Sequence, residues 1–530
     1  IRDETGLASG VFAWDFEIPA RGARDVVLDV PLHAGAAAAP TLSPNDFDVR
    51  LALASAAWRE AVDRVRFRVP PFAETLVATL KSNLAYVLIN RDGPWIQPGS
   101  RAYERSWIRD GALTSSALLR LGHSAEVRDF LVAFAEKQFA DGRIPCCVDA
   151  RGADPVPEHD SHGEFLYLAA EYFRFTGDAT TLGALWPRIA RTVAAIDVLR
   201  RQRRTPEYET SEKRAFHGLL PESISHEGYS DKPVHSYWDD AFARKGLADA
   251  VELALSLGRP DEARSFAAIE GEFEADLLAS IARTIEQNHL DYIPASVEKH
   301  DFDPTSTTAA LSPCGLQGKL PQAELARTFD RYVREARERR DGTKKSDAYT
   351  PYELRTVGAL VRLGRKAEAH EMLAFFMKDR RPAAWNQWAE VVGRDPRAPR
   401  FVGDMPHTWV GTDFIRSFLD FFAIEREGED ARGPSLLLGA GLPEEWVRAP
   451  GGAGVEDLRT IYGPLDLSVS LSGGEVHARI AGVRVPPGGL ALAWPLAGVP
   501  RQATVNGKPA VIRGGEILVR ETPAEVVALP

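Results

Sequence analysis

The sequence predicts a mainly α-helical fold: an (α/α)6 toroid of six helical hairpins, with N-terminal β-strands before it and a C-terminal antiparallel β-sandwich after it. Between residues 72 and 425, about twelve segments carry apolar residues at helical spacing. Their connections alternate between short turns that contain glycine and long loops rich in Trp, Asp, His, Pro and Glu. On both sides of this region the apolar residues recur with a period of two, which is typical of strands.

The first 48 residues are expected to form strands. VFAWDFEIP and VVLDVPLH alternate around the turn-like PARGARD. Because two or three strands are not stable alone, we interpret residues 1–48 as a remnant or part of an N-terminal β-domain, or as a hairpin covering the next domain. AGAAAAPTLSPND has the composition of a linker. The chain opens at Ile1 without a signal-peptide pattern, which suggests a mature form or a fragment.

Residues 49–428 are assigned to the toroid. In LGHSAE, TGDATT, LGRPDE and LGRKAE a glycine stands where a helix C-cap favours positive φ, so these turns are structural. The long loops then share the opposite end, where loops on a rigid scaffold usually carry function. A flat helical solenoid, the competing arrangement, would not need such loops on one side only. The expected helices are 72–89, 111–122, 125–139, 163–177, 181–200, 236–258, 261–285, 305–313, 325–340, 351–364, 366–379 and 407–424.

Residues 429–530 are assigned to the antiparallel β-sandwich. LDLSVSLSGGEVHARIAGVRV contains a Gly-Gly hairpin turn, and ATVNGKPAVI contains an Asn-Gly turn. The segment shows no constellation of chemically active residues. We expect it to pack against the toroid, with carbohydrate binding as the alternative.

Composition narrows the function classes. The net charge of −11, with both signs interspersed, argues against nucleic acid or an anionic membrane as partner. The sequence contains no uninterrupted apolar run of about 18 residues, so we expect no membrane span. Three cysteines exclude a disulfide framework, and zinc and calcium spacings are absent, so we expect no metal and no cofactor. The sequence leaves the oligomeric state open and only weakly favours a periplasmic or secreted location.

The first two long loops offer sugar-binding side chains. Trp107, Arg109 and Asp110 directly precede a helix, near further aromatic residues. Flat aromatic rings pack on the apolar faces of sugars, and an Arg-Asp pair can hydrogen-bond vicinal hydroxyls. In PVPEHDSHGEF, Asp160 is either a helix N-cap or a substrate contact.

The third loop, HGLLPESISHEGYSDKPVHSYWDD, offers the acid. Glu222 lies in the apolar context GLLPES, which would raise its pKa and keep it protonated as a general acid requires. Trp238 and Asp240 are candidate substrate contacts. Asp239 and Asp240 also suit the first turn of a helix.

The fourth and fifth loops are less specific. Asp303 is predicted to start a helix, and Tyr349, Tyr352 and Glu353 are candidates to line the pocket.

The sixth loop, AAWNQWAEVVGRDPRAPRFVGDMPHTW, offers the base. Glu390 lies between two apolar segments, and Trp388 before it and His407 and Trp409 at the helix start after it are candidate substrate contacts. In a six-hairpin toroid the third and sixth loops face one another across the pocket. Glu222 and Glu390 would then flank a glycosidic bond, and a separation of roughly 6.5–9.5 Å would give inversion.

These motifs resemble those of the six-hairpin glycosidases, and of glucoamylases in particular. The Trp-x-Arg-Asp motif of that family, which contacts the non-reducing sugar, matches Arg109 and Asp110 in YERSWIRDG. The base motif Ala-Glu-Gln-Phe followed by Asp-Leu-Thr-Trp matches W-A-E-V-V followed by D-M-P-H-T-W, so the resemblance implies that Glu390 is the base. It covers roughly residues 70–425.

The acid motif departs from the family. In the slot of the Leu-Trp-Glu-Glu motif stands GLLPES, and without a gap Glu222 falls on the second glutamate rather than the catalytic first. Glu227, Asp239 or Asp240 could then supply the proton, and related trehalases use an aspartate. The C-terminal β-domain looks more like those that follow rhamnosidases and related toroids than a starch-binding module.

The sequence therefore predicts an inverting, exo-acting glycoside hydrolase for an α-glucoside or related oligosaccharide. The alternatives are a disaccharide phosphorylase, a polysaccharide lyase of the same fold, and a non-catalytic carbohydrate-binding toroid protein. The presence of Glu390 argues against a phosphorylase, which would replace the base with a phosphate site.

Overall fold

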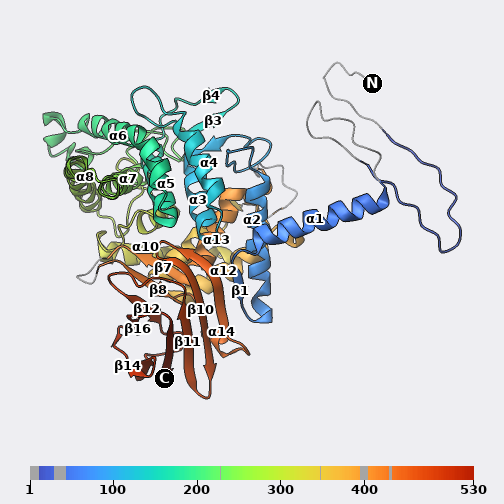
Figure 1. The fold of residues 1–530 in the computed structure, drawn as a ribbon. Coiled ribbons are helices and arrows are strands. Elements are labelled where there is room, and N and C mark those ends of the chain that lie inside the picture. Colours follow the sequence, from blue (N-terminus) through green and yellow to red (C-terminus); the bar gives the residue numbers. More distant parts are fainter. Residues whose placement is uncertain are drawn as a thin grey trace. The chain divides into compact units, whose positions relative to one another are not determined.

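The computed structural model describes residues 11–28, 43–226, 228–346, 348–393, 395, 404–428 and 433–530 (Figure 1). The chain divides into two compact units, Ile1–Asp63 and Arg64–Pro530. The domain boundaries expected after residues 48 and 428 stay predictions.

In the first unit, the helix α1 (Pro44–Val62) begins at a capping box. The Ser43 hydroxyl accepts a hydrogen bond from the Asp46 amide at 3.2 Å, and the Asp46 carboxylate accepts from the Ser43 amide at 2.9 Å. The last four residues of the expected linker, SPND, are a helix start instead, and residues 34–42 of that linker lie outside the described part. Residues 11–28 contain a turn but no strand. The strands expected within residues 11–28 are therefore wrong, since no described strand pairs with this segment, and the rest of that expectation, residues 1–10 and 29–42, lies outside the described part.

In the second unit, twelve helices coincide with the twelve expected segments. The glycines of the short turns have positive φ, as expected; Gly122 has φ 84° and Gly177 has φ 67°. The helices are α2 (Glu74–Ile89), α3 (Ile108–Arg120), α4 (Ser124–Ala135), α5 (Asp160–Thr176), α6 (Ala179–Arg201), α7 (Tyr237–Ser256), α8 (Pro260–Gln287), α9 (Pro304–Leu311), α10 (Gln322–Arg340), α11 (Arg355–Arg362), α12 (Lys366–Phe376) and α13 (Thr408–Leu419).

From α3 to α13, each odd-numbered helix contacts the next odd-numbered helix. α3 packs against α5, α5 against α7, α7 against α9, α9 against α11, α11 against α13, and α13 against α3. All residues of α3 are buried, whereas the longer α8 buries one face only. The closest approach is between α5 and α7, where a Cβ on Gly163 would lie 2.0 Å from the carbonyl oxygen of Phe242. Glycine is therefore required there.

Two sheets follow the helices (Figure 1). Their strand orders are β1-β9-β10-β11-β17-β13-β14 and β15-β16-β12-β8-β7. The pairs are antiparallel, as expected, except that β8 and β12 are parallel, which hairpin turns alone do not predict. The strands are β1 (Arg66–Arg68), β7 (Ala423–Arg426), β8 (Ser435–Leu438), β9 (Ala453–Thr460), β10 (Gly463–Ser472), β11 (Glu475–Ala481), β12 (Leu490–Ala493), β13 (Gln502–Val505), β14 (Lys508–Pro509), β15 (Ile512–Arg513), β16 (Glu516–Val519) and β17 (Ala524–Leu529); the short helix α14 is Glu444–Arg448.

Two small sheets organise the long loops. One joins β2 (Ser106–Trp107), β3 (Cys147–Asp149) and β4 (Gly152–Ala153). The other pairs β5 (Ala348–Tyr349) with β6 (Val392–Gly393), and so ties the fifth long loop to the sixth.

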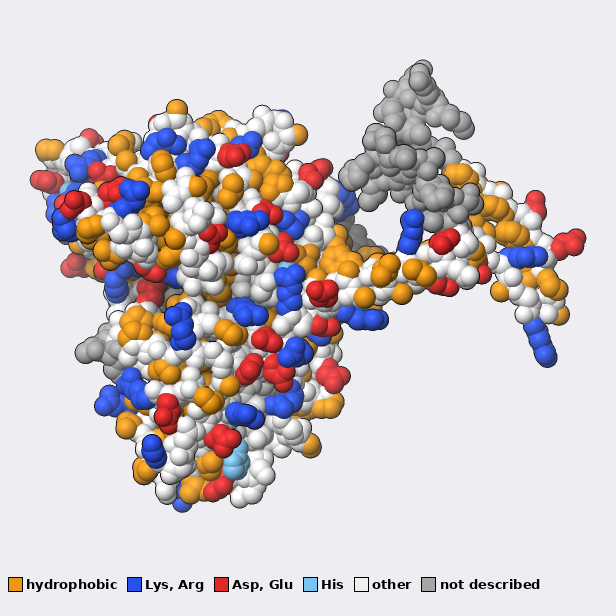
Figure 2. Space-filling view, in the orientation of Figure 1, with side chains coloured by type: hydrophobic (Ala, Val, Ile, Leu, Met, Phe, Trp, Pro, Cys, Tyr) orange, Lys and Arg blue, Asp and Glu red, His pale blue; other side chains and the backbone are white. Residues whose placement is uncertain are grey.

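The surface of the second unit carries charges of both signs, interspersed over the face that Figure 2 displays. By length and composition, one helical stretch among the described residues, Pro71–Ile89, could cross a membrane. One face of this stretch packs against α13.

Candidate functional site

A cavity of about 320 Å³, here called the loop pocket, opens where the long loops enter the helices α3, α7, α9, α11 and α13. The long loops therefore share one end, as the alternation of the connections predicts. Of the residues proposed from the sequence for catalysis or sugar binding, those that line it are Trp107, Arg109, Asp110, Trp238, Glu390, His407 and Trp409. That they contact a sugar stays a prediction.

Glu390 is held by two tyrosines. The Tyr352 hydroxyl donates to Oε1 at 2.9 Å, and the Tyr103 hydroxyl donates to Oε2. Burial, together with the charges of Glu390 and Asp110, holds the pKa of Tyr352 well above its ordinary value, so this phenol remains a donor. Among the described residues no Lys or Arg pairs with Glu390. Within the described part of the chain, the carboxylate is therefore oriented by phenol hydroxyls and not by a cation.

Local structure places each tyrosine. The Asp404 carboxylate accepts from the amides of Arg101 at 2.7 Å, Ala102 at 3.2 Å and Tyr103 at 3.1 Å. A Cβ on Gly99 would lie 2.4 Å from the Asp404 Cβ, so glycine lets this loop close. Tyr352 lies in a 3-10 turn after β5, the strand that pairs with β6 beside Glu390.

His407 begins α13, as GDMPHTW predicts. Its Nδ1 accepts from the Val410 amide at 3.4 Å, and its ring lies 5.3 Å from that of Tyr103. Burial lowers the pKa of His407 to about 3, so the imidazole is neutral at physiological pH.

Two buried acids hold the Arg109 guanidinium in place. It pairs with Glu158 at 2.6 Å and with Asp160 at 3.2 Å, and its guanidinium lies 5.3 Å from the Trp409 ring centroid. Asp160 also accepts from the Trp238 indole at 2.9 Å. Asp160 does not line the loop pocket, because these two bonds keep it behind Arg109 and Trp238.

Arg355, which the sequence did not single out, also lines the pocket. It pairs with Asp413 at 2.7 Å and lies 5.5 Å from the Trp238 ring and 5.0 Å from the Trp409 ring. Because it starts α11 directly after the aromatic fifth loop, its position in the chain was the available signal. Its guanidinium therefore lies near the rings of both Trp238 and Trp409.

Glu222 is not brought to Glu390. It does not line the pocket, and its side chain is 51% exposed. Its carboxylate forms an ion pair with Arg203 and lies 3.7 Å from the His235 ring nitrogen Nε2. Partial burial raises its pKa, but its backbone hydrogen bond, Arg203 and His235 outweigh this, and the net shift is downward. The expected raised pKa is wrong, because GLLPES presents this side chain to a cation rather than to apolar neighbours.

The other predicted acids are distributed as follows. Asp239 and Asp240 are buried and do not line the pocket. Asp239 accepts from Ser225 at 2.6 Å, and Asp240 accepts from the Leu220 amide at 2.9 Å. Burial raises the pKa of Asp240 to about 8. Glu227 lies outside the described residues.

Two further residues have structural roles. Trp388, a predicted sugar contact, is buried away from the pocket and donates to the Phe376 carbonyl at 2.9 Å. Asp303 lines the pocket and caps α9, accepting from the amides of Thr305 and Ser306 at 3.0 Å. Burial raises the pKa of Asp303, but His226 and the cap bonds outweigh it and the net shift is downward.

Among the described residues, one group has ligand atoms close enough to share a metal ion: Cys146, Cys147 and Asp154, within 4.8 Å of one another. Both cysteines are buried against Trp107. The hydrogen bond between the two sulfur atoms, followed by burial, raises the pKa of Cys146, which favours the thiol.

No protein-family model matches the sequence, and no curated protein is detectably similar to it. Solved structures are similar in fold. An α-L-rhamnosidase from Dictyoglumus thermophilum matches with a TM-score of 0.58 and 12% identity, over 88% of this chain and 50% of that one. The Streptomyces avermitilis α-L-rhamnosidase complexed with L-rhamnose gives 0.55 and 15%, over 88% and 42%. The GH78 family rhamnosidase of Bacillus sp. GL1 gives 0.56 and 14%, over 81% and 43%.

The chain thus spans half or less of the length of these relatives. The fold is that of six-hairpin glycosidases of the α-L-rhamnosidase type. The resemblance to glucoamylases is not specifically borne out.

Proposed function

We propose that this chain is a glycoside hydrolase in which α3, α5, α7, α9, α11 and α13 close the inner ring of an (α/α)6 toroid. The observation that carries the proposal is the pairing of Glu390 with two phenol donors in a pocket walled by aromatic rings and two arginines. Aromatic faces and paired charged groups are the chemistry that binds a sugar. A carboxylate oriented without a counterion keeps its ability to accept a proton from water.

Glu390 is proposed as the general base of an inverting mechanism. It would activate a water molecule on one face of the sugar while an acid protonates the leaving oxygen on the other. The neutral His407 beside the two tyrosines adds no charge that would compete with the carboxylate. The rhamnosidase-type fold is consistent with inversion.

For the acid, we propose that Glu227 be tested first among the four candidates. Its chain neighbours His226 and Gly228 both line the loop pocket, whereas Glu222, Asp239 and Asp240 do not. Asp303 is unsuited, since its lowered pKa keeps it ionised and its oxygens cap α9.

The size of the pocket favours exo action on a terminal sugar. Its volume of about 320 Å³ is at the small end of ligand pockets, which span roughly 300–1,000 Å³. The sequence motifs favour an α-D-glucoside, whereas the similar structures include one with L-rhamnose bound. Both sugars are therefore proposed as the first substrates to test.

The test is a hydrolysis screen over aryl α-L-rhamnosides and α-D-glucosides, with NMR of the first-formed anomer. Glu390→Gln should lower kcat by about 10²- to 10⁴-fold, as loss of a general base does. Glu227→Gln should do the same, and Glu222→Gln should stay within a few-fold of wild type. Hydrolysis that survives in Glu390→Gln, or a product of retained configuration, would reject the base assignment.

A non-catalytic carbohydrate-binding protein is the second candidate function. It is favoured by the finding that Glu222, the predicted acid, lies outside the pocket and pairs with Arg203. Binding of a sugar by wild type without any hydrolysis, and unchanged in Glu227→Gln, would select this alternative.

A further inference from the structure

A second cavity of about 1200 Å³, here called the chamber, lies nearer the C-terminal ends of the same inner helices. Residues of α3, α5, α7, α9, α11 and α13 line it, together with the segments beside β7 and β8 and residues 484–487. Of its described lining residues, it shares Trp238 and Arg355 with the loop pocket. The chamber is therefore a separate space, on the far side of these two side chains.

The chamber is locally basic. Among the residues that the structure describes, eight Arg and Lys side chains and six Asp and Glu side chains line it, in a chain whose net charge is −11. The surplus of positive charge runs against the overall charge of the chain, so it is a property of this cavity.

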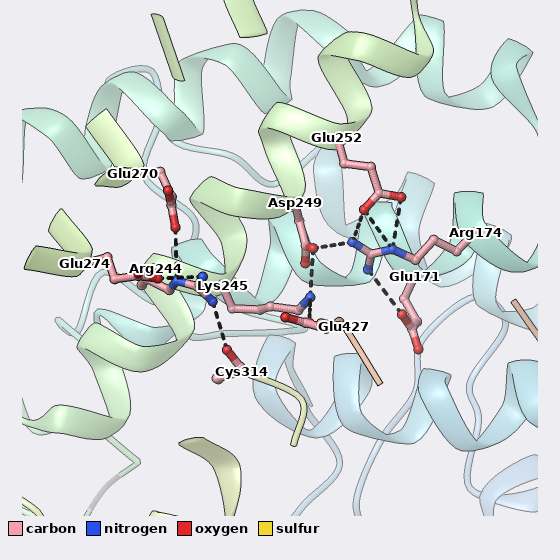
Figure 3. Close-up of polar contacts among 10 residues, drawn as sticks. All are labelled: Glu171, Arg174, Arg244, Lys245, Asp249, Glu252, Glu270, Glu274, Cys314 and Glu427. Carbon is pink, nitrogen blue, oxygen red and sulfur yellow. Dashed lines mark hydrogen bonds and ion pairs between the residues drawn. The ribbon is translucent and has the colours of Figure 1, made fainter. Parts of the chain in front are cut away.

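On the α5 and α7 side the charges are mutually satisfied (Figure 3). Lys245 pairs with Asp249 at 3.0 Å and with Glu427 at 2.8 Å. Arg174 pairs with the same Asp249, with Glu252 at 2.5 Å and with Glu171 at 3.4 Å. This wall leaves little charge for a ligand.

On the α13 side the basic groups outnumber their partners. Asp420 accepts from both Arg120 and Arg362, at 2.8 and 2.9 Å, so one carboxylate serves two guanidinium groups. Arg120 is 6% exposed and also donates to the Ala423 carbonyl at 2.8 Å, so that only its Nε has no hydrogen-bond partner. Buried donors without a partner are rare and point to a missing ligand or water.

Arg416 is the chamber cation with the fewest side-chain partners. It lines the chamber and is half-buried, and within the described residues its guanidinium makes neither a hydrogen bond nor an ion pair, although its charge acts to lower the pKa of Asp413 and of Tyr167. It lies on α13 three residues after Asp413 and four before Asp420, on the same face of the helix. Asp413 is already committed to Arg355 at 2.7 Å.

The acids that face the chamber are poor competitors for a bound anion. Burial raises the pKa of Glu171 and of Asp413, which weakens their negative charge near neutral pH. Glu425 accepts from the Ile461 amide at 3.3 Å. The other acids are engaged in the ion pairs described above.

We propose that the chamber binds a small anion, either a phosphate-type oxyanion or the carboxylate of an organic acid, on Arg416 with Arg120 as a second donor. The planar guanidinium matches both groups with two parallel hydrogen bonds. A cation withdrawn from water without a partner is unfavourable, and a bound anion removes this penalty. The site is independent of the proposed hydrolytic activity.

The test is calorimetric titration of the full chain at low ionic strength with sodium phosphate, with citrate and with a neutral methyl glycoside. Wild type should bind at least one of the two anions, and Arg416→Gln should bind it at least tenfold more weakly. Arg448→Gln is the matched control, because Arg448 is exposed and pairs with Glu444 on α14. Glu390→Gln should bind the anion like wild type whether or not hydrolysis is lost.

Added chloride should weaken binding to wild type, since a partly buried ion pair is still screened. If Arg416→Gln does not fold, Arg416→Lys keeps the charge but loses the planar donors, and it should bind several-fold more weakly. Three results would overturn the proposal: no binding of either anion by wild type, equal affinity in the Arg416 variants, or a neutral glycoside displacing the anion.

Discussion

The loop that presents Tyr103 to Glu390 depends on one carboxylate. Asp404 Oδ2 accepts from the amides of Arg101 and Tyr103, and Oδ1 accepts from that of Ala102. In Asp404→Asn, whichever way the amide turns, its NH₂ group faces at least one of these N–H donors. The substitution therefore removes at least one hydrogen bond and the charge that strengthens those that remain, while it keeps the shape of the side chain.

The size of the effect follows from these bonds. A hydrogen bond to a charged group contributes about 1.5–3 kcal/mol, and a neutral one about 0.5–1.5 kcal/mol. Some is recovered because the freed amides can reach water, so we expect local destabilisation of about 2–3 kcal/mol. Because 1.4 kcal/mol is a factor of ten, the amides of Arg101, Ala102 and Tyr103 should exchange with deuterium roughly 30- to 150-fold faster.

The matched control is Asp178→Asn, which removes an N-cap carboxylate from α6, far along the chain from this loop. It should leave exchange in residues 99–103 unchanged. In Asp404→Asn, kcat/KM should fall by at most roughly 10- to 150-fold, which is the contribution of one charge-assisted hydrogen bond, here that from Tyr103 to Glu390. Tyr103→Phe, which removes this bond directly, should lower kcat/KM by a similar factor. Unchanged exchange in Asp404→Asn would refute the role of Asp404, and fast exchange with full activity would refute the role of Tyr103.

Two further predictions concern stability. Gly163→Ala places a Cβ 2.0 Å from the Phe242 carbonyl oxygen and should destabilise the second unit by about 1–3 kcal/mol in denaturant titration, whereas Gly183→Ala, with open space around it, should be neutral or stabilising. The pKa of Asp178 is lowered to about 2, chiefly by hydrogen bonds from Thr181. Its contribution is therefore present above its unfolded pKa near 3.8 and lost as pH falls through about 2, and Asp178→Asn should flatten that part of a stability profile; an unchanged profile would contradict this.

The helices could be predicted from the sequence because their signals are local. Apolar spacing and a C-capping glycine such as Gly177 lie within a few residues of the element that they define. The order of the loops then placed Trp107, Trp238 and Glu390 in one pocket, since alternate connections of helical hairpins meet at one end. The strands were harder, because the parallel pairing of Leu436 with Leu490 depends on segments more than fifty residues apart.

The directions of polar side chains could not be predicted, because they depend on partners that the sequence does not reveal. Glu222 follows apolar residues, yet Arg203 from the preceding segment turns it away from the pocket. Trp388 is two residues from Glu390, yet its indole is used by the Phe376 carbonyl. Tyr352 was a candidate pocket residue, but its bond to Glu390 required the β5–β6 pairing to be known.

A last prediction asks whether Asp160 touches the sugar or only holds Arg109 and Trp238 in place. Its carboxylate is fully buried and already accepts from Arg109 and from the Trp238 indole, so it has no exposed surface for a sugar hydroxyl. Asp160→Ala should cost about 2–4 kcal/mol of stability, because Arg109 loses one of its acids and keeps Glu158 and the more distant Asp110, while the indole loses its acceptor. It should also raise KM, since both walls of the pocket are released. Trp107→Ala should also raise KM, and because its ring is buried against Cys146 and Cys147 it should cost about 3–5 kcal/mol of stability. Denaturant titration and substrate saturation curves measured on both variants decide between these roles, and a rise in KM for Asp160→Ala without any loss of stability would show that Asp160 touches the sugar itself.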